Sequence, residues 1–245
     1  MKICLAQTKP VRGDIGANLA DHLQYVDWAV ALGSDCIFFP ELSLTGYEPS
    51  LAEDKALLPG EQRLDVFQKY SNTNKMMIGV GAPVRIDSGV GIGMFLFEPD
   101  QARKIYFKKY LHSDELPFFR SEVDFSGILN VHPRIALAIC YEISVDEHLE
   151  QVLPNHPEIY LASVVKFMDG VARARERLTT IAKTHDLVCV MVNSVGEADG
   201  DICGGSTAVW DGNGSLIGQM DAVRPGILVF DTELSQVQIK YKTYP

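Results

Sequence analysis

The apolar residues of this chain recur with two periods, one typical of strands and one typical of helices. Short runs rich in β-branched residues predict strands at 3–7, 35–39, 76–84, 91–97, 104–107, 134–139, 159–163, 187–193, 206–210, 215–220 and 226–231. Apolar residues at helical spacing predict helices over 18–32, 62–70, 145–152 and 169–185. Gly33 is placed to end the first of these helices, and Asp169 is placed to cap the last.

This alternation of strands and helices predicts an α/β fold. Runs such as 37–39, 135–139 and 188–192 are apolar throughout, which indicates central strands covered on both faces. No Gly/Ser-rich or Pro-rich linker interrupts the pattern, so we expect one domain over residues 1–245. The glycine-rich segment 89–93 lies between two strand runs with no helix after it, and we interpret it as part of a hairpin and not as a phosphate-binding loop.

Composition narrows the function classes. Hydrophobic residues make up 47% of the chain and the net charge is −10, which suits a globular protein and counts against a nucleic-acid partner. No apolar run is long enough to cross a bilayer, and residues 1–7 have the pattern of a strand and not of a signal peptide. The five cysteines are odd in number and include no C-x-x-C pair, which predicts reduced thiols in the cytoplasm.

Three reactive side chains directly follow apolar strand runs. Glu41 follows 37–40, Lys108 follows 104–107 and Cys140 follows 134–139. Ligands of α/β sheets gather beyond the carboxyl ends of the strands, so the three groups would meet in one pocket if their strands were parallel neighbours. A thiol needs a base or a nearby positive charge to attack, a carboxylate can be that base, and an ammonium can stabilise an oxyanion. These residue types suit acyl transfer.

Each of these residues also has an ordinary structural explanation. A cysteine at the end of an apolar strand is usually a core residue, a glutamate after Pro40 can cap a turn, and a lysine at a strand end is normally solvated. A papain-like pair of Cys140 with His112 or His185 is an alternative arrangement. The six histidines show no H-x-H or H-x-x-x-H spacing, so we predict no metal site.

The sequence around these residues resembles the nitrilase, or carbon–nitrogen hydrolase, superfamily. The segment FPELSLTGY at 39–47 resembles its glutamate motif, YFKKYLH at 106–112 its lysine motif, and AICYE at 138–142 its nucleophile motif. Weaker similarity continues through GGSTAVW at 204–210. The resemblance therefore covers almost the whole chain, with its three motifs in the family's order.

The resemblance implies a four-layer αββα sandwich, no metal or organic cofactor, and a homodimer or larger homo-oligomer. By motif position, Glu41 would be the general base and acid, Lys108 the oxyanion stabiliser and Cys140 the nucleophile. The amide of Tyr141 would complete the oxyanion hole. Motif register favours Lys108 over the adjacent Lys109.

A second glutamate often follows the lysine motif of this superfamily, where it positions the substrate or supports the base. Glu115 is the candidate here, with a solvated loop carboxylate as the alternative. The chain departs from the family where Phe107 and Tyr110 replace a basic residue and a histidine, and where Asp146-Glu147 replaces a Pro-Glu pair. These departures leave the substrate open.

Together, the motifs predict a hydrolase of carbon–nitrogen bonds other than peptide bonds. The expected substrate is a small linear amide or N-carbamoyl compound, which is cleaved through a cysteine thioester. Hydrolysis of a nitrile, transfer of the acyl group to an amine, and a binding module without turnover are the alternatives.

Overall fold

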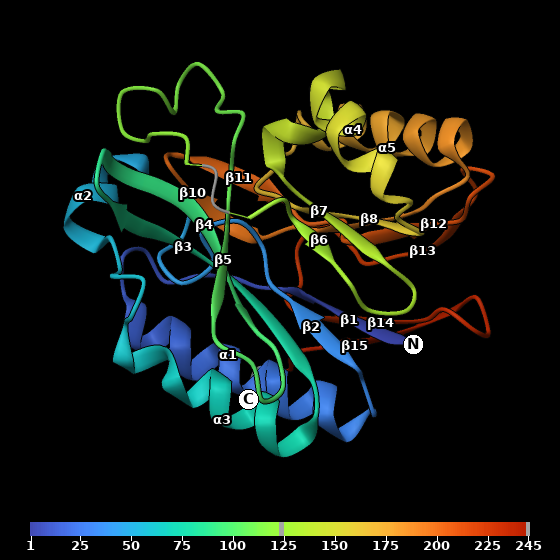
Figure 1. Ribbon diagram of the computed structural model, residues 1–245, viewed down its shortest axis with the longest axis horizontal. Coiled ribbons are helices and arrows are strands. Elements are labelled where there is room, and N and C mark those ends of the chain that lie inside the picture. Colours follow the sequence, from blue (N-terminus) through green and yellow to red (C-terminus); the bar gives the residue numbers. More distant parts are fainter. Residues whose placement is uncertain (123–124, 244–245) are drawn as a thin grey trace.

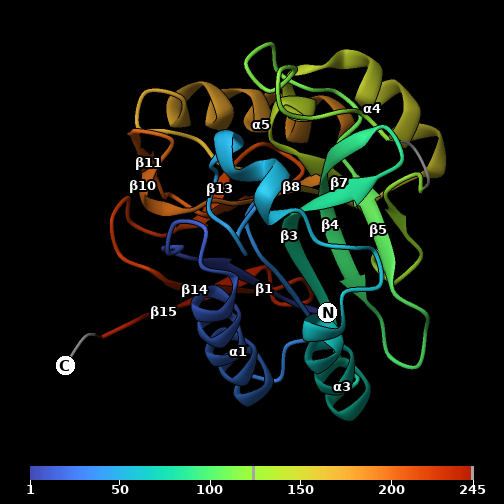
Figure 2. The ribbon, with the colours of Figure 1, turned by 90° about the vertical axis from the view of Figure 1, so that its left-hand side faces the viewer.

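Two β-sheets pack face to face in the computed structural model, and helices cover the outer face of each (Figures 1 and 2). The structure describes residues 1–122 and 125–243. From one side of the molecule to the other the layers are helix, sheet, sheet and helix. The expected αββα sandwich is confirmed.

The first sheet has seven strands in the order β15-β14-β1-β2-β3-β4-β5. Its members are β1 (Lys2–Gln7), β2 (Cys36–Phe38), β3 (Met77–Ile86), β4 (Gly89–Phe97), β5 (Lys104–Phe107), β14 (Gly226–Asp231) and β15 (Gln236–Tyr241). Strands β1, β2 and β3 are parallel, whereas β4 is antiparallel to both β3 and β5. The β3–β4 pair is a hairpin, which confirms the interpretation of the glycine-rich segment.

The second sheet has six strands in the order β13-β12-β9-β8-β7-β6. They are β6 (Ile128–Leu129), β7 (Ile135–Ile139), β8 (Ile159–Ser163), β9 (Val188–Val192), β12 (Ala208–Trp210) and β13 (Leu216–Gln219). The central strands β7, β8 and β9 are parallel. A separate hairpin joins β10 (Val195–Ala198) to β11 (Asp201–Gly204).

Amphipathic helices cover the outer faces. The first sheet is covered by α1 (Ile15–Ala31) and α3 (Asp65–Asn74), and the second by α4 (Asp146–Val152) and α5 (Val171–His185) (Figure 2). The short α2 (Ala52–Lys55) lies near one end of β3 and β4. Within the described residues, none of the helices combines the length and the apolar character needed to span a membrane.

Strand alternation divides the core between the layers. In β1, Ile3 and Leu5 belong to the core cluster that also contains the strands of the second sheet, whereas Cys4 and Ala6 belong to the cluster that also contains residues of α1. In β8, Ser163 Oγ donates to Phe39 O of the first sheet, at 2.9 Å. Because side chains two residues apart in a strand share a face, Leu161 also points between the sheets.

Several predicted boundaries are wrong. The first helix begins at Ile15 and not at Asn18, because Asp14 accepts a hydrogen bond from Ala17 N and acts as its N-cap. The last helix begins after Gly170 with no side-chain cap, so Asp169 does not cap it. Strands β6, β10, β11 and β15 were not predicted.

Candidate active site

Glu41, Lys108 and Cys140 meet at one end of the sandwich, but not from neighbouring strands. Glu41 and Lys108 follow β2 and β5 of the first sheet, with β3 and β4 between them, and Cys140 follows β7 of the second sheet. The three strands are therefore not parallel neighbours, which was the condition under which the sequence placed the groups in one pocket. The groups converge because β2 and β5 run in the same direction and the facing sheet supplies the third residue.

A buried ion cluster surrounds Lys108. Its Nζ donates to Glu41 Oε1 at 2.8 Å and to Glu115 Oε1 at 2.6 Å. The three side chains are almost completely buried. Glu115 also accepts from His112 N at 2.7 Å and from Tyr47 Oη at 3.3 Å. Glu115 is thus part of the cluster and not a solvated loop carboxylate.

Cys140 lies at a sharp turn between β7 and a 3₁₀ helix over Cys140–Ser144. Its φ is +46°, a left-handed conformation that non-glycine residues rarely adopt and that costs about 1–3 kcal/mol. The thiol donates to Val165 O at 3.4 Å, while Val165 N donates to Glu41 Oε2 at 3.2 Å. The backbone of Val165 therefore links the thiol to the carboxylate across the two sheets.

Burial sets the ionisation of these groups. It raises the pKa of Glu41, and the positive charge of Lys108 opposes that shift without cancelling it. Burial disfavours the Lys108 ammonium, but the charges of Glu41, Cys140 and Glu115 outweigh it and hold the pKa of Lys108 above its usual value. Burial and the charge of Glu41 raise the pKa of the Cys140 thiol. A thiol that stays protonated needs a base beside it.

The alternative residues have other partners or positions. Lys109 points away from the cluster, since its Nζ donates to Gln151 Oε1 at 2.6 Å. The exposed His112 pairs its Nδ1 with Asp114 Oδ1 at 2.5 Å. His185 ends α5, whose opposite end lies near Cys140, so the 15-residue helix separates it from the thiol by about 20 Å. Among the described residues, none of the three forms a hydrogen bond or ion pair with Cys140.

A cavity of about 470 Å³ opens beside Cys140. It is lined by Tyr47, His112, Asp114, Glu115, Cys140, Tyr141, Ile143, Ser144, Val165, Lys166, Phe167, Asp169, Gly170, Arg173 and Ala174. Tyr141 lies in the first turn of the 3₁₀ helix that begins at Cys140. Tyr47, Val165, Lys166 and Arg173 were not predicted as site residues, because nothing in their local sequence separates them from other loop or helix positions.

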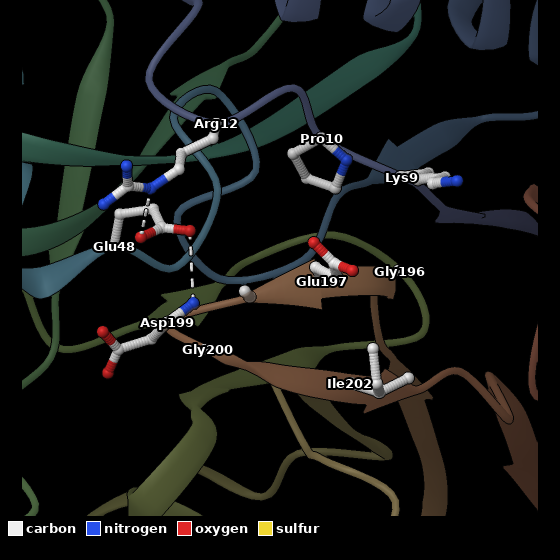
Figure 3. A pocket seen from close by; sticks show the side chains of 10 residues that line it. Lys9, Pro10, Arg12, Glu48, Gly196, Glu197, Asp199, Gly200 and Ile202 are labelled. Carbon is white, nitrogen blue, oxygen red and sulfur yellow. Dashed lines mark hydrogen bonds and ion pairs between the residues drawn. The ribbon is translucent and has the colours of Figure 1, made fainter.

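A larger cavity, of about 800 Å³, lies between the β10–β11 hairpin and the segment after β1 (Figure 3). Arg12 Nε donates to Glu48 Oε2 at 2.9 Å on its wall, and Asp199 N donates to Glu48 Oε1 at 3.2 Å. Its lining, as far as the chain is described, includes no cysteine, serine or threonine. The smaller cavity is therefore the candidate site for acyl transfer. Among all the residues that the structure describes, no three His, Cys, Asp or Glu side chains lie close enough together to hold a metal ion.

Comparison with known proteins identifies the family. The carbon–nitrogen hydrolase family model matches residues 2–240. The glutamine-dependent NAD(+) synthetase of Thermotoga maritima is 22% identical over 96% of this chain and 42% of its own length. The chain spans less than half the length of the curated relatives it matches.

Solved structures show the same fold. An amidase from Nesterenkonia sp. AN1, carrying the acetamide moiety of fluoroacetamide on its active-site cysteine, superposes with a TM-score of 0.82 at 19% identity, covering 94% of this chain and 89% of that one. The glutamine-dependent NAD+ synthetase from Acinetobacter baumannii superposes with a TM-score of 0.80 at 23% identity, covering all of this chain and 48% of that one.

The fold is shared with amidases that have an active-site cysteine, and in this chain Cys140 lines the smaller cavity. The chain belongs to the carbon–nitrogen hydrolase family.

Proposed function

We propose that the protein hydrolyses a small linear amide or N-carbamoyl compound through a thioester on Cys140. The observation that carries this proposal is the position of the Lys108 ammonium, which two buried carboxylates hold beside the linked pair of Cys140 and Glu41. Nucleophile, base and a cation for the oxyanion are then present in one site.

In the acylation step, Glu41 takes the proton of the Cys140 thiol as the sulfur attacks the carbonyl carbon. The C=O bond opens to an oxyanion, which the Lys108 ammonium and the amide of Tyr141 stabilise. Glu41 then passes its proton to the nitrogen, the carbon–nitrogen bond breaks, and ammonia or an amine leaves. Glu115 positions Lys108 and the substrate.

In the deacylation step, the oxygen of a water molecule attacks the carbonyl carbon of the thioester, and Glu41 takes a proton from that water. The carbon–sulfur bond breaks, the acid product leaves, and the thiol recovers its proton from Glu41. Because the same carboxylate is the base in both steps, kcat/KM will fall as the pH drops through the raised pKa of Glu41.

Substitutions at Cys140 and at the two lysines test this proposal. Cys140→Ala should abolish ammonia release from short aliphatic amides, N-carbamoyl compounds and nitriles, and intact mass should detect an acyl adduct on the unsubstituted protein alone. Lys108→Ala should lower kcat by about 100-fold or more, as loss of an oxyanion donor typically does, whereas Lys109→Ala should have little effect. Full turnover by Cys140→Ala would refute the mechanism.

The same assay separates the other functions of this site. Release of ammonia without an added amine distinguishes hydrolysis from acyl transfer, and the nitriles in the panel test attack at a nitrile carbon. A binding module would form no adduct on Cys140.

Compartment and assembly remain proposals. All five cysteines are buried and unpaired, which supports a reducing cytoplasm. We further propose a homodimer or larger homo-oligomer, on the basis of the family resemblance.

A further inference from the structure

The segment that leaves β8 passes between the two sides of the site. Its residue Val165 donates its N–H to Glu41 Oε2 at 3.2 Å, and its carbonyl accepts from the Cys140 thiol at 3.4 Å. Two residues earlier, the Ser163 hydroxyl donates to the backbone that follows β2, at 2.9 Å. The segment 163–166 is therefore in contact with both the proposed base and the proposed nucleophile.

Asn193 holds the far end of this segment. It directly follows β9 and is completely buried. Its Oδ1 accepts from Lys166 N at 2.9 Å, and its Nδ2 donates to Lys166 O at 3.1 Å. The same Nδ2 donates to Gly205 O at 2.8 Å, and the same Oδ1 accepts from Ser194 N at 2.9 Å. The two donors and two acceptor sites of this amide are thus all used on backbone groups.

The position of Asn193 is itself fixed across the two sheets. Asn193 N donates to Thr207 Oγ1 at 3.1 Å, and Thr207 N donates to Gln7 Oε1 at 3.0 Å. Gln7 ends β1 of the first sheet, and its Nε2 donates to Asp221 O at 2.8 Å and to Arg224 O at 2.9 Å. A buried polar network whose members are all paired is rigid. Asn193 is therefore a firm support for the segment it holds.

The geometry of the peptide group carries this support to the thiol. The carbonyl of Val165 and the N–H of Lys166 belong to one planar peptide group and point in opposite directions. Because Asn193 binds the N–H, it also fixes the direction of the carbonyl that accepts from the Cys140 thiol. The N–H of Val165, in the next peptide group, is then held toward the carboxylate.

We propose that Asn193 is a positioning residue for acyl transfer, which fixes the Val165 backbone between the base and the nucleophile. This proposal rests on the function proposed above. Asn193 is not among the described residues that line the cavity beside Cys140, so it acts on the reactive groups and not on the substrate.

The pKa of Glu41 reports whether the Val165 N–H is in place. A hydrogen bond to the carboxylate favours its charged form, so loss of this bond raises the pKa further. The titratable groups that act on Glu41 are Lys108, Glu115, Cys140 and Tyr47. Substitution of Asn193 leaves all four in the chain, and a shift of the acid limb of kcat/KM is then assigned to the backbone bond.

Two substitutions at Asn193 test the proposal on the amide that the wild type hydrolyses fastest. Asn193→Ala should lower kcat by about tenfold or more and leave KM within about twofold, because the reactive groups are misplaced and the cavity wall is not. The acid limb of kcat/KM should move to higher pH by about half to one unit. Asn193→Asp keeps the acceptor for Lys166 N and should lose less kcat than Asn193→Ala.

Asn18 provides the matched control. It is buried, and it binds a single residue in the same reciprocal way, with Val11 N donating to its Oδ1 at 2.7 Å and its Nδ2 donating to Val11 O at 2.8 Å. Asn18→Ala should lower the urea midpoint, as Asn193→Ala does, and leave the acid limb at its wild-type pH. The comparison separates loss of stability from loss of positioning.

Alkylation of Cys140 by iodoacetamide gives the pH profile without amide turnover. The sulfur displaces iodide from the reagent's carbon while Glu41 takes the thiol proton, so the rate should fall with the same acid limb. The other four cysteines are at most 2% exposed, and intact mass of the wild type and of Cys140→Ala assigns the adduct. Asn193→Ala should shift this profile in the same direction.

Wild-type kcat and an unmoved acid limb in both folded Asn193 variants would overturn the inference, while amide turnover by the wild type would still uphold the proposed function. Absence of amide turnover and of an acyl adduct would overturn the proposed function. The alkylation profile would then still decide whether Asn193 positions the thiol and the carboxylate.

Discussion

Glu142 joins the two sides of the site without lining the cavity. Its Oε2 accepts from Ile139 N at 2.8 Å and from Tyr106 Oη at 2.7 Å, and its Oε1 accepts from Lys109 N at 2.7 Å. Ile139 precedes Cys140, and Lys109 follows Lys108 of the ion cluster. One fully buried carboxylate therefore fixes the backbone on both sides of the active centre.

Replacing this carboxylate by its amide removes an acceptor that donors already occupy. In Glu142→Gln, one NH₂ group faces an N–H or O–H donor, so we expect a loss of about 2–3 kcal/mol of stability and a lower kcat. Urea denaturation and steady-state kinetics on the same preparation measure both effects. Glu147→Gln, on the exposed side of α4, is the control. Wild-type stability and kcat in Glu142→Gln would show that this carboxylate is not needed.

His148 makes stability depend on pH. Burial and the charge of Lys109 lower its pKa from 6.5 to about 4. The unfolded chain therefore binds more protons than the native protein between these values, and stability is lost as the pH falls through this window. We expect His148 to contribute a loss of about 2 kcal/mol between pH 7 and pH 5.

The His148 contribution is isolated by comparison with a variant that cannot titrate there. Urea midpoints of the wild type and of His148→Gln at pH 7 and pH 5 give the difference, and the buried His22, whose pKa is lowered to about 3, contributes equally to both proteins. An equal drop in both proteins would assign the acid sensitivity to other groups.

At the level of single residues, the sequence predicted that Glu41, Lys108 and Cys140 lie close together, but it did not predict what surrounds them. Glu41, Lys108 and Cys140 were found because each directly follows an apolar strand run and lies in a motif. Lys166 and Arg173 reach the cavity through a loop and a helix terminus, and no local pattern indicates where such positions lie. The left-handed backbone of Cys140 could not be predicted from its residue type either, because glycine is the residue that favours this conformation.

Strand β3 sets the position of the segment that carries Glu41. Gly81 of β3 lies so close to this segment that an added Cβ would be 2.4 Å from Pro40 O and 2.6 Å from Leu42 N. Both contacts are with backbone on either side of Glu41. The strand therefore has no room for a side chain at this position.

Gly81→Ala should displace the Glu41 segment. We expect a stability loss of about 1–3 kcal/mol from overpacking and a fall in kcat/KM measured at a temperature where the variant is folded. Gly60→Ala is the matched control, since no atom lies within 4 Å of its added Cβ. Unchanged kcat/KM in a folded Gly81→Ala protein would show that the base tolerates the shift.

Elements with a full apolar run were predicted correctly, and short or half-exposed elements were missed. The buried strands β7, β8 and β9 follow the predicted ranges closely. Strand β15 at the sheet edge was not predicted, although Val237, Ile239 and Tyr241 alternate with polar residues. The β10–β11 hairpin has too few apolar residues for a strand signal, because it is stabilised by contacts with distant segments such as Met168 N to Ile202 O.

Across the whole molecule, the layer between the sheets aligns the site. Leu161 of β8 is buried in this layer, in register with Leu137 and Val190 of the adjacent strands. Leu161→Ala should cost about 2–5 kcal/mol through the lost apolar contacts and the cavity left behind. We also expect kcat to fall, because the two sheets would pack less closely.

Denaturation and kinetics together test this prediction. Leu216→Ala, at a half-exposed position of β13, removes the same atoms from the surface and should change stability and kcat little. If Leu161→Ala lost stability but kept full kcat, the alignment of the site would not depend on the packing of this layer.

The four-layer arrangement was predicted from the family resemblance and not from the hydrophobic pattern. The pattern indicated strands covered on both faces, which a single sheet between helices would also satisfy. In the first sheet, β14 pairs with β1, and the paired residues are more than two hundred positions apart in the chain. No local sequence pattern predicts a pairing of this kind.

The ion cluster and the nucleophile also lie on different stretches of the chain. Glu41, Lys108 and Glu115 all precede residue 122, whereas Cys140, Val165 and Asn193 all follow residue 125. Each stretch carries an incomplete set of reactive groups, and β14 of the later stretch must pair with β1 of the earlier one. During synthesis the nascent chain thus acquires the proposed base and ammonium well before the proposed nucleophile, and it cannot form the proposed acyl-enzyme until the later strands have been added.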